Sequence, residues 1–200
     1  MSSHALLSPS SAHRWLNCTL APRLEATLPN KSSSYAEEGT LAHSVCELTA
    51  KKYFTVMKNA EFNKSLKEFK NNPLWNDEML HTAETYTEHI KEKAMSFKNS
   101  PYITFEVRVE LDDYVPEAFG RCDCIMFGDD TLVITDYKHG KGVAVSAKEN
   151  PQMMLYALGA LKRYQPIYGD AVKKICLCID QPRINRYETW ECSKDELLAW

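Results

Sequence analysis

Two neighbouring segments decide the fold, Gly-Arg-Cys-Asp-Cys-Ile at residues 120–125 and Leu-Val-Ile-Thr-Asp-Tyr-Lys at residues 132–138. A Gly-Asp-Asp turn at residues 128–130 separates them, and this arrangement predicts a β-hairpin. Each strand presents one carboxylate, from Asp123 and from Asp136, and Lys138 follows the second by two residues. An acid at the end of an apolar strand is costly to bury unless something binds it. The hairpin therefore predicts a divalent-cation site, and the chemistry that fits it best is hydrolysis of a phosphodiester.

The segments around the hairpin carry clear periodic patterns. Between residues 102 and 111 apolar residues alternate with polar ones, which predicts a half-buried strand. Further strands are expected at about 119–127, 131–137, 172–180 and 186–192, with a helix at about 149–164 after a loop rich in Gly and Lys. The order of helix, three strands, helix and strand predicts an α/β fold around a mixed sheet.

The first half of the chain is expected to be mainly helical. Ser8 as N-cap and Pro9 at the first helical position begin a short helix that runs towards Cys18. A polar loop follows at residues 28–34, and Ser34 with Glu37 fits a capping box, which predicts a helix at about 35–54. Residues 61–98 have helical spacing that is broken near 72–73, which predicts an inserted helical pair. The second helix of this pair is expected to bury Leu80, Ala83, Tyr86, Ile90 and Ala94.

We expect one domain over residues 1–200. Its parts are an N-terminal helix and loop at 1–34, a core at 35–60 and 100–192, and a helical insertion at 61–99. A second capping box, Ser193 with Glu196, begins a helix that the last residues barely enter. Residues 193–200 are therefore expected to be the start of a truncated C-terminal helix.

The composition is that of an ordinary globular protein, with 44% hydrophobic and 26% charged residues. No apolar run is long enough for a membrane span, and the N-terminus lacks the pattern of a secretory signal, so a cytoplasmic location is expected. The net charge of −3 argues against a non-specific coat of nucleic acid, but it allows an acidic metal site inside a basic rim. The candidate rim residues are Arg121, Lys138, His139, Lys141 and Lys148.

The two aspartates and the lysine form the main candidate site. Mg²⁺ and Mn²⁺ prefer oxygen ligands, and carboxylates on neighbouring strands can bridge one ion. Lys138 points to the same face as Asp136 in an extended strand, where it could orient water or stabilise charge on a phosphate. The backbone carbonyl of Tyr137 would face the same space. In the alternative interpretation, Asp136 caps the strand end and Lys138 is a solvated loop residue.

Two pairs of helical residues are candidates for a supporting role. His43 and Glu47 share one face of their helix, so His43 could bind the metal through a ring nitrogen. Glu47 could support the metal-binding residues by contacting them, or it could form a salt bridge. Gln152 and Tyr156 also share a face and could contact a phosphate or a base. The alternatives are a structural histidine, a surface glutamine and a core tyrosine. Glu106, in the first strand, is a further candidate for a residue behind the ligands.

The seven cysteines are an odd number, and in a cytosolic chain thiols or ligands are favoured over disulfides. Cys122 and Cys124 flank Asp123 and are expected to face away from it as small core residues. Cys176 and Cys178 alternate in a strand and have the same interpretation. Cys18 is left as a possible ligand of an iron–sulfur cluster.

With these motifs in this order, the chain resembles the RecB-like branch of the PD-(D/E)XK nuclease superfamily, which includes CRISPR-associated exonucleases and phage-encoded relatives. The matching motifs are Gly39 to His43, Gly120 to Asp123, Asp136-Tyr137-Lys138 and Gln152 to Tyr156. Residues 8–18 and 37–43 are similar to a phage and prophage group of that branch.

The resemblance implies a restriction-endonuclease-like core of order αβββαβ with a helical insertion. It implies Mg²⁺ or Mn²⁺ bound by His43, Asp123, Asp136 and the Tyr137 carbonyl, with Lys138 as the catalytic lysine. It also implies that Gln152 and Tyr156 contact DNA, and Arg121 and Lys141 of the basic rim are expected to bind DNA as well.

The chain departs from the family pattern at two points. Thr19 stands where family members usually have proline after the first cysteine. Many relatives bind an iron–sulfur cluster through one early and three late cysteines; Cys18 fits the first position, but nothing fits the other three, so no complete cluster is expected.

These observations predict a metal-dependent DNA nuclease, an exonuclease or end-processing enzyme. It would act on single- or double-stranded DNA ends in phage recombination, in the cytoplasm of a bacterial host, and a phage recombination protein is an expected partner. One alternative is a module that keeps the fold and binds nucleic acid or a partner without useful catalysis. A second alternative is a metal-dependent phosphoesterase that acts on small nucleotides.

Overall fold

The computed structural model describes residues 5–28 and 33–200, and its centre is a five-stranded mixed sheet of order β1-β2-β3-β4-β5. Neighbouring strands are antiparallel except for β3 and β4, which are parallel and connected through helix α6 (Pro151–Tyr168). The strands are β1 (Tyr102–Glu110), β2 (Phe119–Gly128), β3 (Thr131–Tyr137), β4 (Lys174–Gln181) and β5 (Arg186–Ser193). The prediction of an α/β fold around a mixed sheet is confirmed.

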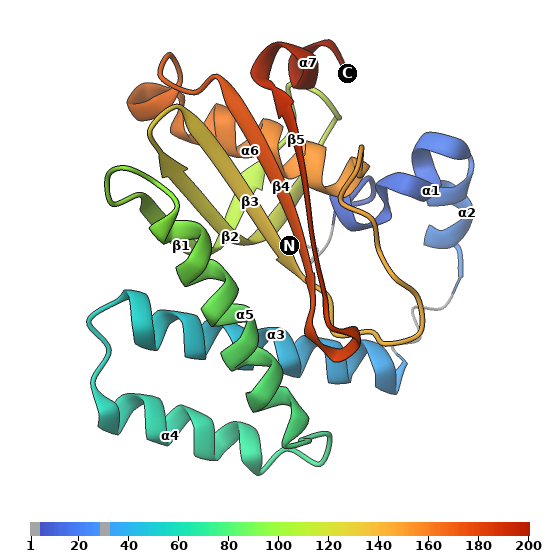
Figure 1. The fold of residues 1–200 in the computed structure, drawn as a ribbon. Coiled ribbons are helices and arrows are strands. Elements are labelled where there is room, and N and C mark those ends of the chain that lie inside the picture. Colours follow the sequence, from blue (N-terminus) through green and yellow to red (C-terminus); the bar gives the residue numbers. More distant parts are fainter. Residues whose placement is uncertain (1–4, 29–32) are drawn as a thin grey trace.

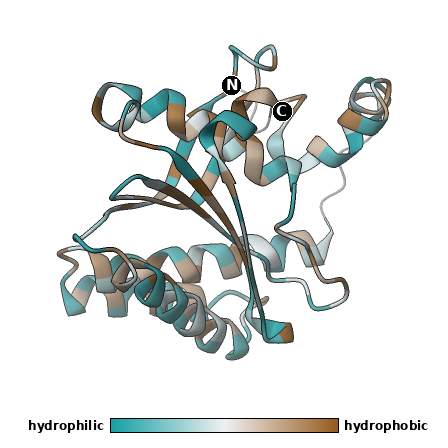
Figure 2. Ribbon diagram, turned by 45° about the horizontal axis from the view of Figure 1, so that its top comes forward, coloured by the Kyte–Doolittle hydropathy of each residue, from teal (hydrophilic) through white to brown (hydrophobic). Residues whose placement is uncertain are grey.

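Helices cover both faces of the sheet, so the protein has three layers (Figures 1 and 2). On one face, Leu132 and Ile134 of β3 pack with the buried side chains of α6. On the other face, Val133 and Tyr137 pack with α3 (Ser34–Phe54) and α5 (Glu78–Met95), beside which lies α4 (Asn59–Lys70). Because alternate residues of a strand point to opposite faces, β3 contributes side chains to both cores. In Figure 2 the strands of the sheet carry much of the hydrophobic colouring.

The long helices follow their sequence signals, but the N-cap of α3 differs from the prediction. The cap is Ser33, whose extended backbone lets its side chain accept a hydrogen bond from the Ala36 N–H. Ser34 is already helical, so its assignment as the capping residue was wrong. Of the polar loop predicted at 28–34, residues 29–32 lie outside the described residues. The helical pair 61–98 is confirmed as α4 and α5, with Tyr86 and Ile90 among the buried residues of α5.

The N-terminal helix is shorter than predicted. Ser8 is followed by a 3₁₀ turn, η1 (Pro9–Ser11), then α1 (Ala12–Asn17) and a separate α2 (Ala21–Ala26). Both the backbone N–H and the hydroxyl of Ser11 donate to the Ser8 carbonyl, which tightens the first turn. Trp15 Nε1 donates to the same carbonyl, at 3.0 Å, and fixes η1 against α1.

The last two helices have clear caps. α6 begins at Pro151, two residues later than predicted, because the Asn150 side chain accepts from the N–H groups of Gln152 and Met153. The capping box of Ser193 with Glu196 is confirmed, and it begins α7 (Lys194–Ala199). None of the helices in the described part of the chain combines the length and apolar character that crossing a membrane requires.

The strands β1 and β2 are distorted at the same level. Glu106 has a φ of 53°, in the left-handed region, and the paired residues on either side of it are Phe105 with Cys124 and Val107 with Cys122. The distortion moves Phe105 into the core under α3 and α5 but Val107 into the core under α6. It also sends Cys122 and Cys124 into opposite cores. Both cysteines are buried as expected, but the view that they share one face away from Asp123 is wrong.

Gly120 gives a test of the packing at this end of β2. A Cβ at this position would lie 2.6 Å from Cε1 of Tyr156 and 2.7 Å from Cγ of Pro9, and both neighbours are buried. We expect Gly120→Ala to lower the free energy of unfolding by about 1–3 kcal/mol, because the extra methyl overpacks the contact between η1, β2 and α6. Urea denaturation measures this change.

Gly39 provides the matched control. It lies inside α3, and a Cβ there would meet no atom within 4 Å. We expect Gly39→Ala to raise the free energy of unfolding by about 1 kcal/mol, the ordinary gain of alanine over glycine in a helix. Equal effects of the two substitutions would contradict the close approach at Gly120.

Candidate metal centre

Asp123 lies where strands β2 and β3 separate. The last paired residues at this end are Cys124 and Thr135. Beyond them, the Asp123 side chain replaces a backbone carbonyl of β2 as the hydrogen-bond acceptor for β3. Its Oδ2 accepts a hydrogen bond of 2.7 Å from the backbone N–H of Tyr137. The same Oδ2 lies 3.3 Å from Nδ1 of His43. One carboxylate thus joins β2, β3 and α3.

His43, Glu106 and Asp123 form a compact group of possible ligands. Among residues 5–28 and 33–200, these three side chains each offer an atom that lies within 4.8 Å of the other two. His43 comes from α3, Glu106 from the distorted residue of β1, and Asp123 from β2. The left-handed φ of Glu106 is a costly conformation for a non-glycine residue, and such strain is concentrated at functional sites.

All three side chains of the compact group have shifted pKa values. Burial lowers the pKa of His43, but the adjacent Asp123 carboxylate, with Asp136 and Glu106, raises that pKa to about 9. Burial and the charges of Asp123 and Glu47 raise the pKa of Glu106 to about 7. Burial also disfavours the charged form of Asp123, yet His43 and the Tyr137 N–H hold its pKa below the ordinary value. The pKa values of His43 and Glu106 are thus raised, so a metal ion must compete with protons for these two groups.

Asp136 is held on the other side of β3, towards α6. Its side chain is only 2% exposed, and its Oδ2 lies 2.7 Å from Nζ of Lys138. Gln152 Nε2 donates to Asp136 Oδ1 at 3.1 Å, while Lys138 Nζ donates to Gln152 Oε1 at 2.9 Å. Asp136 and Lys138 are therefore close together as predicted, and Gln152 bonds to both, but Asp136 stands outside the compact group, where Glu106 takes the third place.

The pKa shifts of this second cluster follow from its burial. Burial raises the pKa of Asp136; the Lys138 ammonium opposes the rise and the Asp123 carboxylate adds to it. Burial lowers the pKa of Lys138, but Asp136 and Asp123 reverse the effect, so this pKa stands above the ordinary value. Lys138 is thus a permanent positive charge at neutral pH.

The remaining predicted site residues lie around these clusters. Tyr156 is buried, and its hydroxyl accepts from Gln152 Nε2 at 3.2 Å. Glu47 pairs with Lys51 one turn further along α3, and it lies beside Glu106 in the small cleft of the site. Arg121, Lys141 and Cys18 are exposed. The Tyr137 backbone reaches the site through its N–H, and the ligand role of its carbonyl stays a prediction.

The sequence did not identify Arg183, and it gave Glu106 a different place. Glu106 was expected to support the ligands and not to be one of them, because the alternating pattern of its strand does not distinguish it from Thr104 or Arg108. Only its left-handed φ, which the sequence does not show, marks it as a ligand candidate. Arg183 is nearly buried and donates to Glu78 Oε2 through Nε and Nη2, at 3.0 and 2.7 Å. It also donates to the His139 carbonyl and approaches Glu38, so it ties the β4–β5 turn to α3 and α5.

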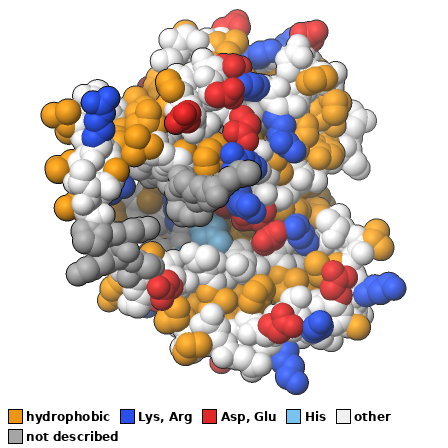
Figure 3. All heavy atoms as spheres, turned by 180° about the vertical axis from the view of Figure 1, so that it is seen from behind, with side chains coloured by type: hydrophobic (Ala, Val, Ile, Leu, Met, Phe, Trp, Pro, Cys, Tyr) orange, Lys and Arg blue, Asp and Glu red, His pale blue; other side chains and the backbone are white. Residues whose placement is uncertain are grey.

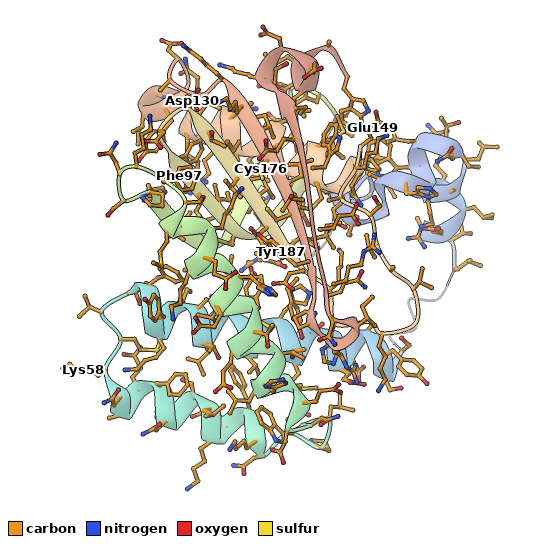
Figure 4. All side chains as sticks on the ribbon, viewed as in Figure 1. Lys58, Phe97, Asp130, Glu149, Cys176 and Tyr187 are labelled. Atoms are coloured by element: carbon orange, nitrogen blue, oxygen red, sulfur yellow. The ribbon has the colours of Figure 1, made fainter. Side chains whose placement is uncertain are left out.

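The clusters lie at one end of the sheet. Figure 4 labels Asp130 in the β2–β3 turn at one end and Tyr187 towards the other. Tyr187 is paired with Asp180, which is paired with Tyr137, so the site is at the Tyr187 end. Seen from behind, the molecule is hollowed near the middle of its face, with a histidine in the hollow and charged side chains around it (Figure 3).

An open cavity of about 670 Å³ lies beside Lys138 and Gln152. It runs between η1 and the loop that leads from β3 to α6, and its wall includes His13, Lys148 and Asn150. Its volume is in the usual range of ligand pockets. A polymer phosphate lying in it would meet the charge of Lys138 at one end.

The residues at the site fit a divalent cation. Among the described residues, no donor lies in hydrogen-bond geometry to the buried Asp136 Oδ2, although Lys138 is close enough for an ion pair. An imidazole and two carboxylates that converge on one point are a donor set for Mn²⁺, and the carboxylates also suit Mg²⁺.

A family model described as "Protein of unknown function (DUF2800)" matches residues 4–200, and the chain belongs to this family. Among solved structures, the chain is similar to one titled "Crystal structure of SSO0001", with 12% sequence identity and a TM-score of 0.33. This match covers 81% of the present chain and 84% of the other chain.

The pKa values predict how a metal ion competes with protons. A ligand set that includes His43 and Glu106 must lose the proton of His43 below pH 9 and that of Glu106 below pH 7, since their pKa values are about 9 and about 7. The affinity for Mn²⁺ should therefore rise about tenfold per pH unit between pH 7 and 9, and more steeply below pH 7. Titration calorimetry in buffers of different ionisation enthalpy counts the protons released.

Glu106 and Glu47 form a matched pair of variants for the same measurement. Glu106→Gln should weaken Mn²⁺ binding by about tenfold or more, because it removes a ligand oxygen, whereas Glu47→Gln removes a nearby charge outside the group and should have a much smaller effect. Equal losses in the two variants would show that Glu106 contributes only background charge.

Proposed function

We propose that this member of the DUF2800 family is a metal-dependent DNA nuclease with a restriction-endonuclease-like core. The observation that carries the proposal is the placement of two clusters at the separating ends of β2 and β3: the compact group of His43, Glu106 and Asp123, and Asp136 with its lysine. The element order α3, β1, β2, β3, α6 and β4 is consistent with that core, with α4 and α5 as the insertion.

The groups that would hold the cation come from four elements. Asp123 is common to every arrangement, because it is fixed by the Tyr137 N–H and lies beside His43. Glu106 is the third member of the compact group, whereas Asp136 lies on the α6 side of β3 and holds Lys138 beside the group. A bound Mg²⁺ or Mn²⁺ would polarise the phosphate oxygen and lower the pKa of bound water.

Lys138 is suited to stabilise charge and to orient groups, not to accept a proton. Its raised pKa keeps the ammonium charged, and contacts with Asp136 and Gln152 fix its position. An ammonium held in this way can hydrogen-bond a water molecule on one side and a phosphate oxygen on the other. Gln152 orients Lys138, and Tyr156 in turn orients Gln152 by accepting its N–H.

DNA is the substrate that the surroundings favour. The cavity beside Lys138 adds Lys148, His13 and the amide of Asn150, which are donors for a phosphodiester backbone. The motifs that resemble RecB-like nucleases support the same substrate and an action in phage recombination or DNA processing. This resemblance also supports action on DNA ends.

The test is degradation of linear single- and double-stranded DNA in Mg²⁺ or Mn²⁺, with EDTA as the metal-free control. We expect Asp136→Asn to lower the rate by about a hundredfold or more, because it removes the charge next to both Lys138 and the ligand group. Asp170→Asn is the matched control, since Asp170 is exposed in the loop after α6 and outside the site. Circular dichroism melting confirms folding of both variants.

Two outcomes would contradict the proposal. Cleavage that survives Asp136→Asn would mean that another site does the chemistry. Salt-dependent DNA binding by the wild type without cleavage under either metal would instead favour a binding module.

A further inference from the structure

A second, smaller cavity lies on the side of η1 away from Lys138. Its volume is about 250 Å³, and its wall is made by η1, the ends of β1 and β2, and Tyr156 of α6. The N-terminal helices stand beside α6 at this point (Figure 1). The residues that give the cavity its chemistry are Ser8, Ser10, Arg108, Phe119 and Arg121.

The cavity is cationic. Arg108 and Arg121 are register partners on β1 and β2, and both side chains line the cavity. The Arg108 guanidinium lies over the Phe119 ring, with 3.7 Å between its Cζ and the ring centroid, and this contact fixes its plane. The hydroxyls of Ser8 and Ser10 add neutral donors to the same wall.

Both arginines keep donors for a ligand. Arg108 Nε donates to Glu110 at 2.7 Å, and Arg121 Nε lies 3.8 Å from Glu106 Oε2. Each of these contacts uses Nε, and each guanidinium carries four further N–H donors on its two Nη nitrogens. Paired guanidinium groups with free forks are the usual partners of phosphate oxygens.

The cavity borders the candidate metal centre on two sides. Arg121 reaches Glu106, which belongs to the compact ligand group. Tyr156 lines the cavity with its ring, while its hydroxyl accepts from Gln152, the partner of Asp136 and Lys138. A group bound in the cavity would therefore be next to the bond that the centre acts on.

We propose that this cavity binds the terminal phosphate of a DNA strand; the proposal rests on the proposed function, because it places one end of that substrate. A terminal phosphomonoester carries close to two negative charges at neutral pH, about twice the charge of an internal phosphodiester. Two arginines discriminate in favour of the higher charge. The cavity is smaller than most ligand pockets, and its volume of about 250 Å³ suits a phosphate with the adjoining sugar.

The test measures binding in EDTA, so that it does not depend on cleavage. Fluorescence anisotropy compares short single strands that end in a 5′-phosphate, a 3′-phosphate or hydroxyls only. The wild type should bind one of the phosphorylated strands about tenfold more tightly than the hydroxyl-ended strand. Inorganic phosphate should compete with that strand and leave the other unaffected.

Arg108→Ala is the decisive variant, because Arg108 touches neither the ligand group nor Asp136. It should reduce the ratio of the two affinities to nearly one, and Arg121→Ala should do the same. Arg163→Ala is the matched control, since Arg163 is exposed on α6 outside the cavity, and it should keep the wild-type ratio.

The outcomes separate this proposal from the nuclease proposal. Equal binding of phosphorylated and hydroxyl-ended strands by the wild type would overturn it, as would an unchanged ratio in both Arg108→Ala and Arg121→Ala. A preference for a terminal phosphate in a protein that cleaves no DNA would uphold the cavity and remove the nuclease. Cleavage of DNA by a protein that shows no preference for terminal phosphates would uphold the nuclease proposal and overturn the proposal for the cavity.

Discussion

The structure of the site depends on one hydrogen bond, the 2.7 Å bond from the Tyr137 N–H to the Asp123 carboxylate. It stands where β2 and β3 part and where a backbone carbonyl can no longer serve as acceptor. A carboxylate used as a strand extender is an anion placed inside the sheet, and a buried anion needs compensation. His43 supplies it in the described state, at 3.3 Å. A cation is the alternative compensation, so the same bond that closes the sheet also creates the candidate metal centre.

The two aspartates of the hairpin have different environments. Asp123 is fixed by a backbone donor and a histidine, which hold its pKa low, so it remains a ready ligand. Asp136 is buried against Lys138, and its pKa is raised. Pairs of acids whose surroundings push their pKa values apart are a common arrangement in active sites. Here the division follows from the alternation of β3, which sends Tyr137 towards α3 and Asp136 towards α6.

The sequence predicted the parts of the site that local patterns encode. The strands follow from alternation, α7 follows from its capping box, and the closeness of Asp136 and Lys138 follows from their spacing. The sequence could not predict Glu106 as a member of the ligand group, because Glu106 and Arg108 have the same position in the alternating pattern of β1. Only the left-handed φ of Glu106 turns its side chain towards His43. The bonds of Arg183 to Glu78 and His139 also escaped prediction, since they join segments far apart in the chain.

The distortion at Glu106 explains why the compact group of possible ligands and the cavity lined by Arg108 and Arg121 are neighbours. Up to Phe105 the odd residues of β1 serve the core under α3 and α5; beyond it Val107 serves the core under α6. One conformational change therefore turns Glu106 towards His43 and leaves Arg108 beside Arg121 at the edge of the sheet. An undistorted β1 would keep Phe105 and Val107 in one core and would not bring Glu106 to Asp123. The left-handed conformation costs about 1–3 kcal/mol, and it places the carboxylate of Glu106 and the guanidinium of Arg108 in neighbouring sites.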